Sequence, residues 1–146
     1  MRLEHLGRVR DIEIACFSDP WPLAAFRREL VRKAAGGYPR VLVEEGEVLA
    51  FSISWFAADE ANLANLAVHP AHRRRGCGRA LLQDLLEEAR RRGSGSIWLE
   101  VRAGNARAQR LYADHGFQTV AVRKGYYRKE GEDALVMVKD LTGGKD

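Results

Sequence analysis

The sequence is poor in the features that would indicate a metal site, a disulfide scaffold or a membrane segment. It has only two cysteines, Cys16 and Cys77, and their spacing fits neither a metal-ligand pair nor a disulfide framework. No apolar run approaches the roughly 20 residues that a membrane-spanning helix needs. The N-terminal stretch MRLEHLGRVRDIEIA carries charges where a signal peptide would need an apolar core. We therefore expect a cytoplasmic protein that is stabilised by a packed apolar interior.

Signals for two common catalytic chemistries are also missing. The serine nucleophile motif G-x-S-x-G does not occur. The residues His69, His72 and His115 share no metal-ligand spacing and no carboxylate cluster, so we expect them in turns or on the surface and predict no metal. Nothing in the sequence places a base beside Cys77, so covalent catalysis by that thiol has no support.

The remaining composition is that of one soluble globular domain. The chain has 146 residues, 46% of them hydrophobic and 30% charged, and a chain of this length buries roughly 70% of the surface that it exposes when unfolded. Its net charge of +4 suits an acidic partner such as a nucleotide, a nucleic acid or the ribosome surface. Because 20 acidic residues are interspersed, most arginines are expected on solvated faces, and the run from Arg73 to Arg75 is the exception.

Hydrophobic periodicity predicts an α/β (α+β) fold. A period near 3.6 indicates helices at residues 8–17, 22–35, 79–92 and 106–114, the last capped by Asn105. A period of two indicates strands at residues 2–5, 40–44, 48–56, 62–68, 97–102, 117–122 and 134–138, with a polar loop over 123–133. This order of helices and strands predicts one domain over residues 1–141, in which helices cover both faces of a mixed, mostly antiparallel sheet, followed by a flexible tail over 142–146.

The stretch NLANLAVHPAHRRRGCGRALL combines a strand, a turn, three arginines and Gly76-Cys77-Gly78 at the start of a helix. The first N–H groups of a helix lack intrahelical partners and the helix dipole is positive there, so such a loop binds phosphate or pyrophosphate. A P-loop is excluded because Gly78 is followed by Arg79 and not by Lys with Ser or Thr. A dinucleotide fingerprint is disfavoured, because a leucine replaces its third small residue and His69 to Arg75 separate the strand from the glycine.

Two ordered motifs carry a family resemblance. The first is R-x-x-G-x-G at Arg73, Gly76 and Gly78, and the second is N-x-x-A-x-x-L-Y-x-x-x-G-F within WLEVRAGNARAQRLYADHGF, residues 98–117. With both motifs present in this order, the sequence resembles the GCN5-related N-acetyltransferase (GNAT) family. The resemblance implies the GNAT fold and acetyl-CoA as cosubstrate.

Within that family, the sequence is most similar to the RimI-type ribosomal protein alanine N-acetyltransferases. The similar pieces are a Pro-Trp pair at 20–21, the Asp-Glu-Ala turn at 59–61, WLEVR, and the tyrosine pair followed by Glu-Asp-Ala. They span most of the chain, although Gly125 stands where such proteins often carry a polar residue. The resemblance implies transfer of acetyl to the N-terminal α-amine, expected to be that of alanine, of a protein such as a ribosomal protein.

Carried over by position, the resemblance implies a donor site built from backbone groups. The strand would align the acetyl and pantetheine portion, the glycine loop would hold the pyrophosphate, and Asn105 would bind the cofactor near its middle. The implied cofactor-binding residues are Leu66, Ala67, Val68, Arg73, Arg74, Arg75, Gly76, Cys77, Gly78, Arg79 and Asn105.

The resemblance implies that Glu100 is the general base and Tyr112 the general acid. An amine attacks a thioester only when neutral, and a carboxylate can take its proton, directly or through water. The carboxylate of Glu100 could instead pair with Arg102 or with an arginine of a neighbouring strand. The hydroxyl of Tyr112 could protonate the departing thiolate, or the residue could simply fill core space. A strand N–H near Val68, freed by a bulge or a splayed neighbour, is the expected donor to the acetyl oxygen.

The acceptor rim is expected around Trp21, Tyr126 and Tyr127, and Trp21 could equally be a packed aromatic corner. An α-amine has a reference pKa of about 8 and lysine one of about 10.4, so an N-terminus is easier to deprotonate. Alternatives are a lysine or small-molecule amine acceptor, or a non-catalytic acyl-CoA-binding module. Direct nucleic-acid binding is not expected, because no aromatic residues interleave the basic ones, and the sequence indicates neither a membrane partner nor an oligomeric state.

Overall fold

The computed structural model describes residues 1–127 and 131–143. The helices are α1 (Leu6–Cys16), α2 (Leu23–Val31), α3 (Cys77–Arg91) and α4 (Ala106–Asp114), with short 3-10 turns η1 (Leu3–His5), η2 (Arg32–Ala35) and η3 (Pro70–His72). The strands are β1 (Gly37–Glu44), β2 (Glu47–Ala57), β3 (Glu60–Val68), β4 (Ser96–Arg102), β5 (Gln118–Tyr127) and β6 (Glu132–Asp140).

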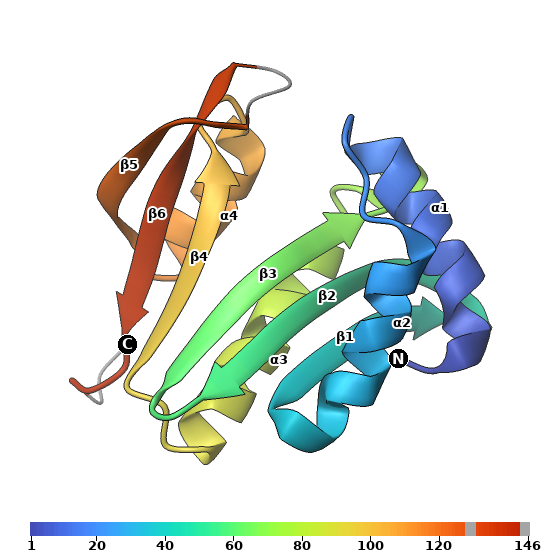
Figure 1. Ribbon diagram of the computed structural model, residues 1–146, viewed down its shortest axis with the longest axis horizontal. Coiled ribbons are helices and arrows are strands. Elements are labelled where there is room, and N and C mark those ends of the chain that lie inside the picture. Colours follow the sequence, from blue (N-terminus) through green and yellow to red (C-terminus); the bar gives the residue numbers. More distant parts are fainter. Residues whose placement is uncertain (128–130, 144–146) are drawn as a thin grey trace.

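The strands form one sheet in the order β1-β2-β3-β4-β6-β5. All neighbouring pairs are antiparallel except β3 with β4, which are parallel. Helices α1 and α2 cover one face of β1 to β3, whereas α3 and α4 lie against the opposite face (Figure 1). The predicted fold class, a mostly antiparallel sheet with helices on both faces, is therefore confirmed.

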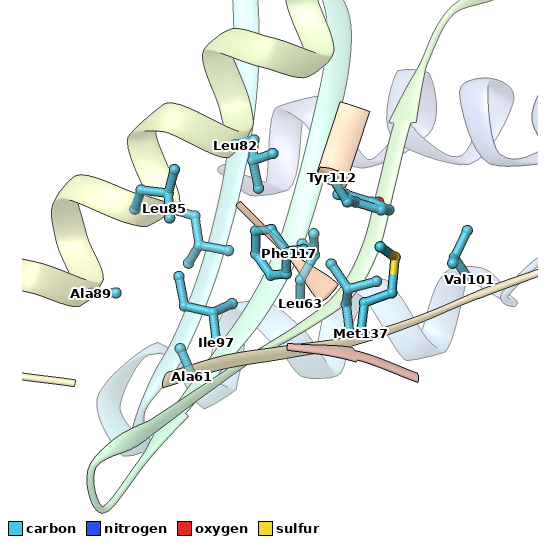
Figure 2. Packing of buried hydrophobic residues seen from close by; sticks show 12 residues of the cluster. Ala61, Leu63, Leu82, Leu85, Ala89, Ile97, Val101, Tyr112, Phe117 and Met137 are labelled. Carbon is cyan, nitrogen blue, oxygen red and sulfur yellow. The ribbon is translucent and has the colours of Figure 1, made fainter. Parts of the chain in front are cut away.

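The apolar interior is divided by the sheet into two layers. On one face, the apolar stripe of α3 packs on β3, β4 and β6, and Figure 2 shows Leu82 and Leu85 near Phe117 and Ile97, with Met137 of the same cluster farther along, beside Tyr112. On the other face, α1 and α2 contribute a separate cluster that packs on β2. The members of that second cluster include Val9, Ile12, Phe26, Phe51, Ile53 and Ala67, all less than 5% exposed.

The feature that positions the site is the parting of β3 from β4. These strands pair only from Glu60 with Ser96 to Leu63 with Leu99. Beyond Leu63 they diverge, as Figure 1 shows. The second half of β3 therefore keeps β2 as its neighbour on one edge and opens its other edge.

Two predicted elements are wrong. Residues 2–5 form no strand, because the N–H of Arg2 donates to Nδ1 of His5 and the N–H of His5 donates back to the carbonyl of Arg2, which turns the chain into η1. The polar loop expected over 123–133 is largely strand: Arg123 pairs with Ala134 and Tyr127 with Glu132. Residues 128–130 of that segment and 144–146 of the expected tail lie outside the described residues.

Candidate active site

A cleft of about 860 Å³ occupies the place where β3 and β4 part. Its walls come from the end of α1 and the segment after it, the open half of β3, the glycine loop with the start of α3, the end of β4, and α4. Of these segments, the glycine loop with the start of α3, the end of β4 and α4 carry the two sequence motifs. The predicted site residues are thus brought together, with the exceptions described below.

A bulge in β3 changes which way its side chains point. The register with β2 shifts between Ile53 opposite Asn65 and Ser54 opposite Leu63, so Ala64 is an extra residue. As a result, Leu63 packs in the α3 layer whereas Ala67 packs in the α1 and α2 layer. Without the bulge, these two residues would face the same side.

The open edge of β3 presents two backbone amides to the cleft. The N–H of His69 donates to the carbonyl of Leu49 at 2.9 Å, so this pair and every second pair before it face β2. The N–H groups of Leu66 and Val68 therefore point away from β2, toward the cleft. The N–H of Val68 thus lies where the sequence predicts a donor, since β3 has a bulge at Ala64 and β4 diverges from it.

The glycine loop bends sharply before α3 begins. Arg74 has φ 65° and Gly76 has φ 80°, a left-handed conformation that glycine adopts without strain. Helix α3 then starts at Cys77, and its first amides lie at the cleft wall. The loop residues that line the cleft are Arg73, Arg74, Gly76, Cys77, Gly78 and Arg79.

Arg75 differs from its neighbours in the arginine run. It does not line the cleft; its guanidinium donates to the carboxylate of Glu44 at 2.6 Å and lies 2.9 Å from Nδ1 of His72. Its side chain therefore ties the glycine loop to the end of β1. A direct cofactor contact by this side chain is not supported.

Helix α4 closes the far wall of the cleft. The side chain of Asn105 accepts a hydrogen bond from the N–H of Ala108 at 3.1 Å, as a helix cap does. Arg107 and Arg110 also line the cleft, although neither is among the site residues expected from the sequence. The sequence does contain a signal for them: they lie three residues apart on the helix that Asn105, a predicted site residue, caps.

Glu100 lines the cleft from the sheet face that carries α1 and α2. Its strand neighbours Leu99 and Val101 are buried in the α3 layer, so alternation places Glu100 on the other face. One nitrogen of Arg123, in β5, donates to both carboxylate oxygens at 3.1 and 2.9 Å. Pairing with an arginine of another strand, the alternative that the sequence left open, is thus present.

Tyr112 lines the same cleft from the opposite face of the sheet. It is 6% exposed and packs on Phe117, with ring centroids 5.9 Å apart, and Figure 2 shows it beside Met137. Burial, and secondly Tyr127, raise the pKa of its hydroxyl. Tyr112 thus combines a cleft-lining position with a hydroxyl that stays protonated.

Of the three aromatic residues predicted at the acceptor rim, two line the cleft and one does not. Trp21 lines the cleft and packs on Phe26, with centroids 5.3 Å apart, so the expected packed corner and cleft wall are both present. Tyr127 also lines the cleft, under the guanidinium of Arg102 at 3.9 Å. Tyr126 does not line it: this residue is 44% exposed and stacks under Arg123 at 3.9 Å.

Comparison with known proteins decides the family. Residues 6–117 match the profile of the Acetyltransferase (GNAT) family. The chain belongs to this family. GNAT enzymes take their acetyl group from acetyl-CoA. The cleft suits that donor, because the amides at the start of α3 and five arginines line it, and such groups attract phosphates. Those arginines are Arg73, Arg74, Arg79, Arg107 and Arg110.

Individual GNAT relatives cover most of the chain. The ribosomal protein bS18-alanine N-acetyltransferase of Escherichia coli strain K12 is 46% identical over 103 residues, 69% of this chain and 70% of that protein. The N-alpha-acetyltransferase RimI of Mycobacterium tuberculosis is 39% identical over 142 residues, 91% of this chain and 85% of that one. A crystal structure of the Escherichia coli S18-alanine enzyme has a TM-score of 0.88 at 36% identity, covering 97% of this chain and 90% of that chain.

Two further findings concern metals and membranes. Across the described ranges, 1–127 and 131–143, no group of three or more His, Cys, Asp or Glu side chains could hold a metal ion. None of the helices in those ranges is long and apolar enough to cross a membrane.

Proposed function

We propose that this GNAT enzyme acetylates the α-amine of a protein N-terminus, with the N-terminal alanine of ribosomal protein bS18 as the leading candidate. The observation that carries the proposal is that Glu100 and Tyr112 line one cleft from opposite faces of the sheet, on either side of the opened β3 edge. The names of the Escherichia coli relatives, which cover most of the chain, supply the candidate acceptor.

The donor is held by backbone groups and arginines on the α3 and α4 side. The amides from Arg74 to Arg79 bind phosphate oxygens, and Asn105 and the β3 edge bind the extended arm of the donor. Bound acetyl-CoA supplies an activated acetyl group as a thioester. The N–H of Val68, fixed by the β2–β3 ladder, is a preorganised donor for the acetyl oxygen.

The acceptor enters from the other face, between Trp21 and Tyr127. Glu100 takes the proton that the amine loses as it attacks, directly or through water. Tyr112 stays protonated because burial disfavours its anion, and it donates a proton to the departing thiolate. Base and acid therefore act at opposite ends of the bond exchange, as a direct transfer requires.

Acceptor binding must open the pair between Glu100 and Arg123. Their side chains are 33% and 51% exposed, and ion pairs at this exposure contribute about 0–1 kcal/mol. The acceptor amine, which reacts in its neutral form, can therefore displace Arg123 from Glu100 at little cost. Residues 1–141 would carry this activity in the cytoplasm, where ribosomal proteins are made, and 142–146 would not be needed.

A comparison of two acceptor peptides tests the proposal. The purified chain is incubated with acetyl-CoA and either a peptide that begins with a free alanine or a matched peptide with a blocked N-terminus and an internal lysine, and released CoA is measured. We expect CoA release with the first peptide and at least about tenfold less with the second, because the α-amine is the more readily neutralised group. Equal rates, or faster turnover of the lysine peptide, would reject an N-terminal specificity.

A further inference from the structure

Glu13 is a buried carboxylate at the cleft that the proposed chemistry does not use. It lies in α1, is 1% exposed and lines the cleft wall. One of its oxygens accepts the backbone N–H of Trp21 at 2.9 Å, and the other accepts the side-chain amide of Asn65 at 2.8 Å. A single carboxylate thus fastens α1, the segment that leads into α2, and β3.

A buried carboxylate such as that of Glu13 is costly for a residue whose only role is packing. Burial dominates over its hydrogen bonds and raises its pKa, and within the described parts of the chain it forms no ion pair. A buried carboxylate without an ion-pair partner is unfavourable compared with an apolar side chain of similar size. The hydrogen bonds from Trp21 and Asn65, and after them the nearby charge of Arg10, offset part of this cost. Glu13 therefore holds these two donors in place.

Both donors belong to the reaction site. Asn65 follows the bulge at Ala64, faces α1, and directly precedes Leu66, whose N–H points into the cleft. Trp21 forms the acceptor-side wall. The distance between the strand that presents the acetyl group and the wall that receives the amine is therefore set through Glu13.

We propose that Glu13 is a positioning residue for the acceptor, holding the Trp21 segment and the open half of β3 at a fixed spacing. The inference rests on the proposed N-terminal acetyltransferase function and names a further residue of that same site. Loosening this link lets the amine and the acetyl group drift apart. The pyrophosphate loop is a separate segment, and the open half of β3 keeps its ladder with β2, so most of the donor affinity is preserved.

The test compares three variants with a matched control. Glu13→Ala removes both hydrogen bonds, and Asn65→Asp makes two carboxylates face each other. The double variant Glu13→Gln with Asn65→Asp restores both hydrogen bonds with the amide and the carboxylate exchanged. The control is Glu29→Ala in α2, which is also buried at 6% and loses a bond to Nε1 of Trp55 at 2.7 Å, but does not line the cleft.

We expect kcat/KM for the alanine peptide to fall about tenfold or more in Glu13→Ala and Asn65→Asp, mainly in acceptor KM, and to return to within about threefold of wild type in the double variant. The dissociation constant of acetyl-CoA should stay within about twofold throughout. Glu29→Ala should lower Tm without changing peptide kinetics.

Three results would overturn the inference. They are an equal kinetic loss in Glu29→Ala, a double variant no better than Asn65→Asp, and unchanged kinetics in Glu13→Ala. If Asn65→Asp does not fold, the matched pair of alanine variants decides alone. A wild-type chain that is inactive on all peptides would instead refute the proposed function.

Discussion

Arg123 donates hydrogen bonds from one guanidinium nitrogen to both carboxylate oxygens of Glu100. The two residues lie on β5 and β4 with β6 between them, and the small side chain of Ala134, opposite Arg123, leaves the arginine room to reach across. Without an acceptor, the proposed base is thus occupied by a cation in the place where the amine would bind. Under the proposed function, the acceptor and Arg123 would therefore compete for Glu100.

Removing that competitor is expected to help the enzyme slightly. An exposed ion pair contributes at most about 1 kcal/mol, which corresponds to about fivefold in an equilibrium, so Arg123→Gln should raise kcat/KM for an alanine peptide by up to that factor. Steady-state kinetics at low salt measure it. Lys124→Gln, at an 86% exposed neighbour, is the control and should change nothing. A tenfold loss in Arg123→Gln would mean that the arginine itself contacts the acceptor.

The proposed acid and base have a direct test. Glu100→Gln and Tyr112→Phe should each slow turnover of an alanine peptide by about 10²-fold or more, because each removes a proton-transfer group and little volume. Acetyl-CoA affinity, measured by calorimetry, should be unchanged. Tyr126→Phe is the control, since that exposed ring lies outside the cleft. Full activity in both site variants would reject the assigned roles.

The site could be predicted from the sequence where local motifs fix it. Asn105 caps α4 as its spacing predicts, and Gly76 takes the left-handed conformation that the loop needs. Both depend on interactions within a few residues. The bounds of α4, Ala106–Asp114, agree with the prediction for the same reason.

Contacts between distant segments could not be predicted in this way. The pairing of Glu13 with Asn65 depends on the bulge at Ala64, which turns Asn65 toward α1. The mark that the bulge leaves in the sequence is that Leu63 and Leu66, three residues apart, pack on the same side of the sheet, and a period-two prediction does not use this spacing. Likewise, the side chain of Arg75 pairs with Glu44 at the end of β1, a residue 31 positions away in the sequence.

The left-handed conformation of Gly76 predicts a loss of donor affinity on substitution. Gly76→Ala places a Cβ in open space but forces a φ of 80°, which costs L-residues about 1–2 kcal/mol. Gly46→Ala is a close control, because Gly46 has the same φ and open surroundings in the β1–β2 turn. Both variants should lose similar stability in thermal melts. Only Gly76→Ala should weaken acetyl-CoA binding. Equal affinity in the two variants would mean that the glycine loop does not contribute to cofactor binding.

The N-terminal amine predicts a pH effect on stability. Burial, with the nearby charges of Lys33, Arg40 and Arg2, lowers the Met1 amine pKa from 8.0 to about 6. The folded chain then binds this proton less readily than the unfolded chain. The contribution of the neutral amine to the free energy of unfolding is therefore fully present above pH 8 and is lost as the pH falls through about 6. NMR titration of the labelled amine checks this, with a urea-unfolded sample as the control. A folded-state pKa near 8 would contradict it.

Asn105 combines two roles that substitution can separate. Its Oδ1 caps α4, and the proposed function assigns its side chain to the donor as well. Asn105→Asp keeps the cap acceptor, whereas Asn105→Ala loses it at a cost of about 1 kcal/mol. We therefore expect only the alanine variant to melt earlier, but both to raise the KM for acetyl-CoA, the aspartate variant more because it adds negative charge to a cleft built for phosphates. If the aspartate variant kept the wild-type KM, Asn105 would be a helix cap alone, and recognition of the donor would rest on the β3 edge and the arginines of the cleft.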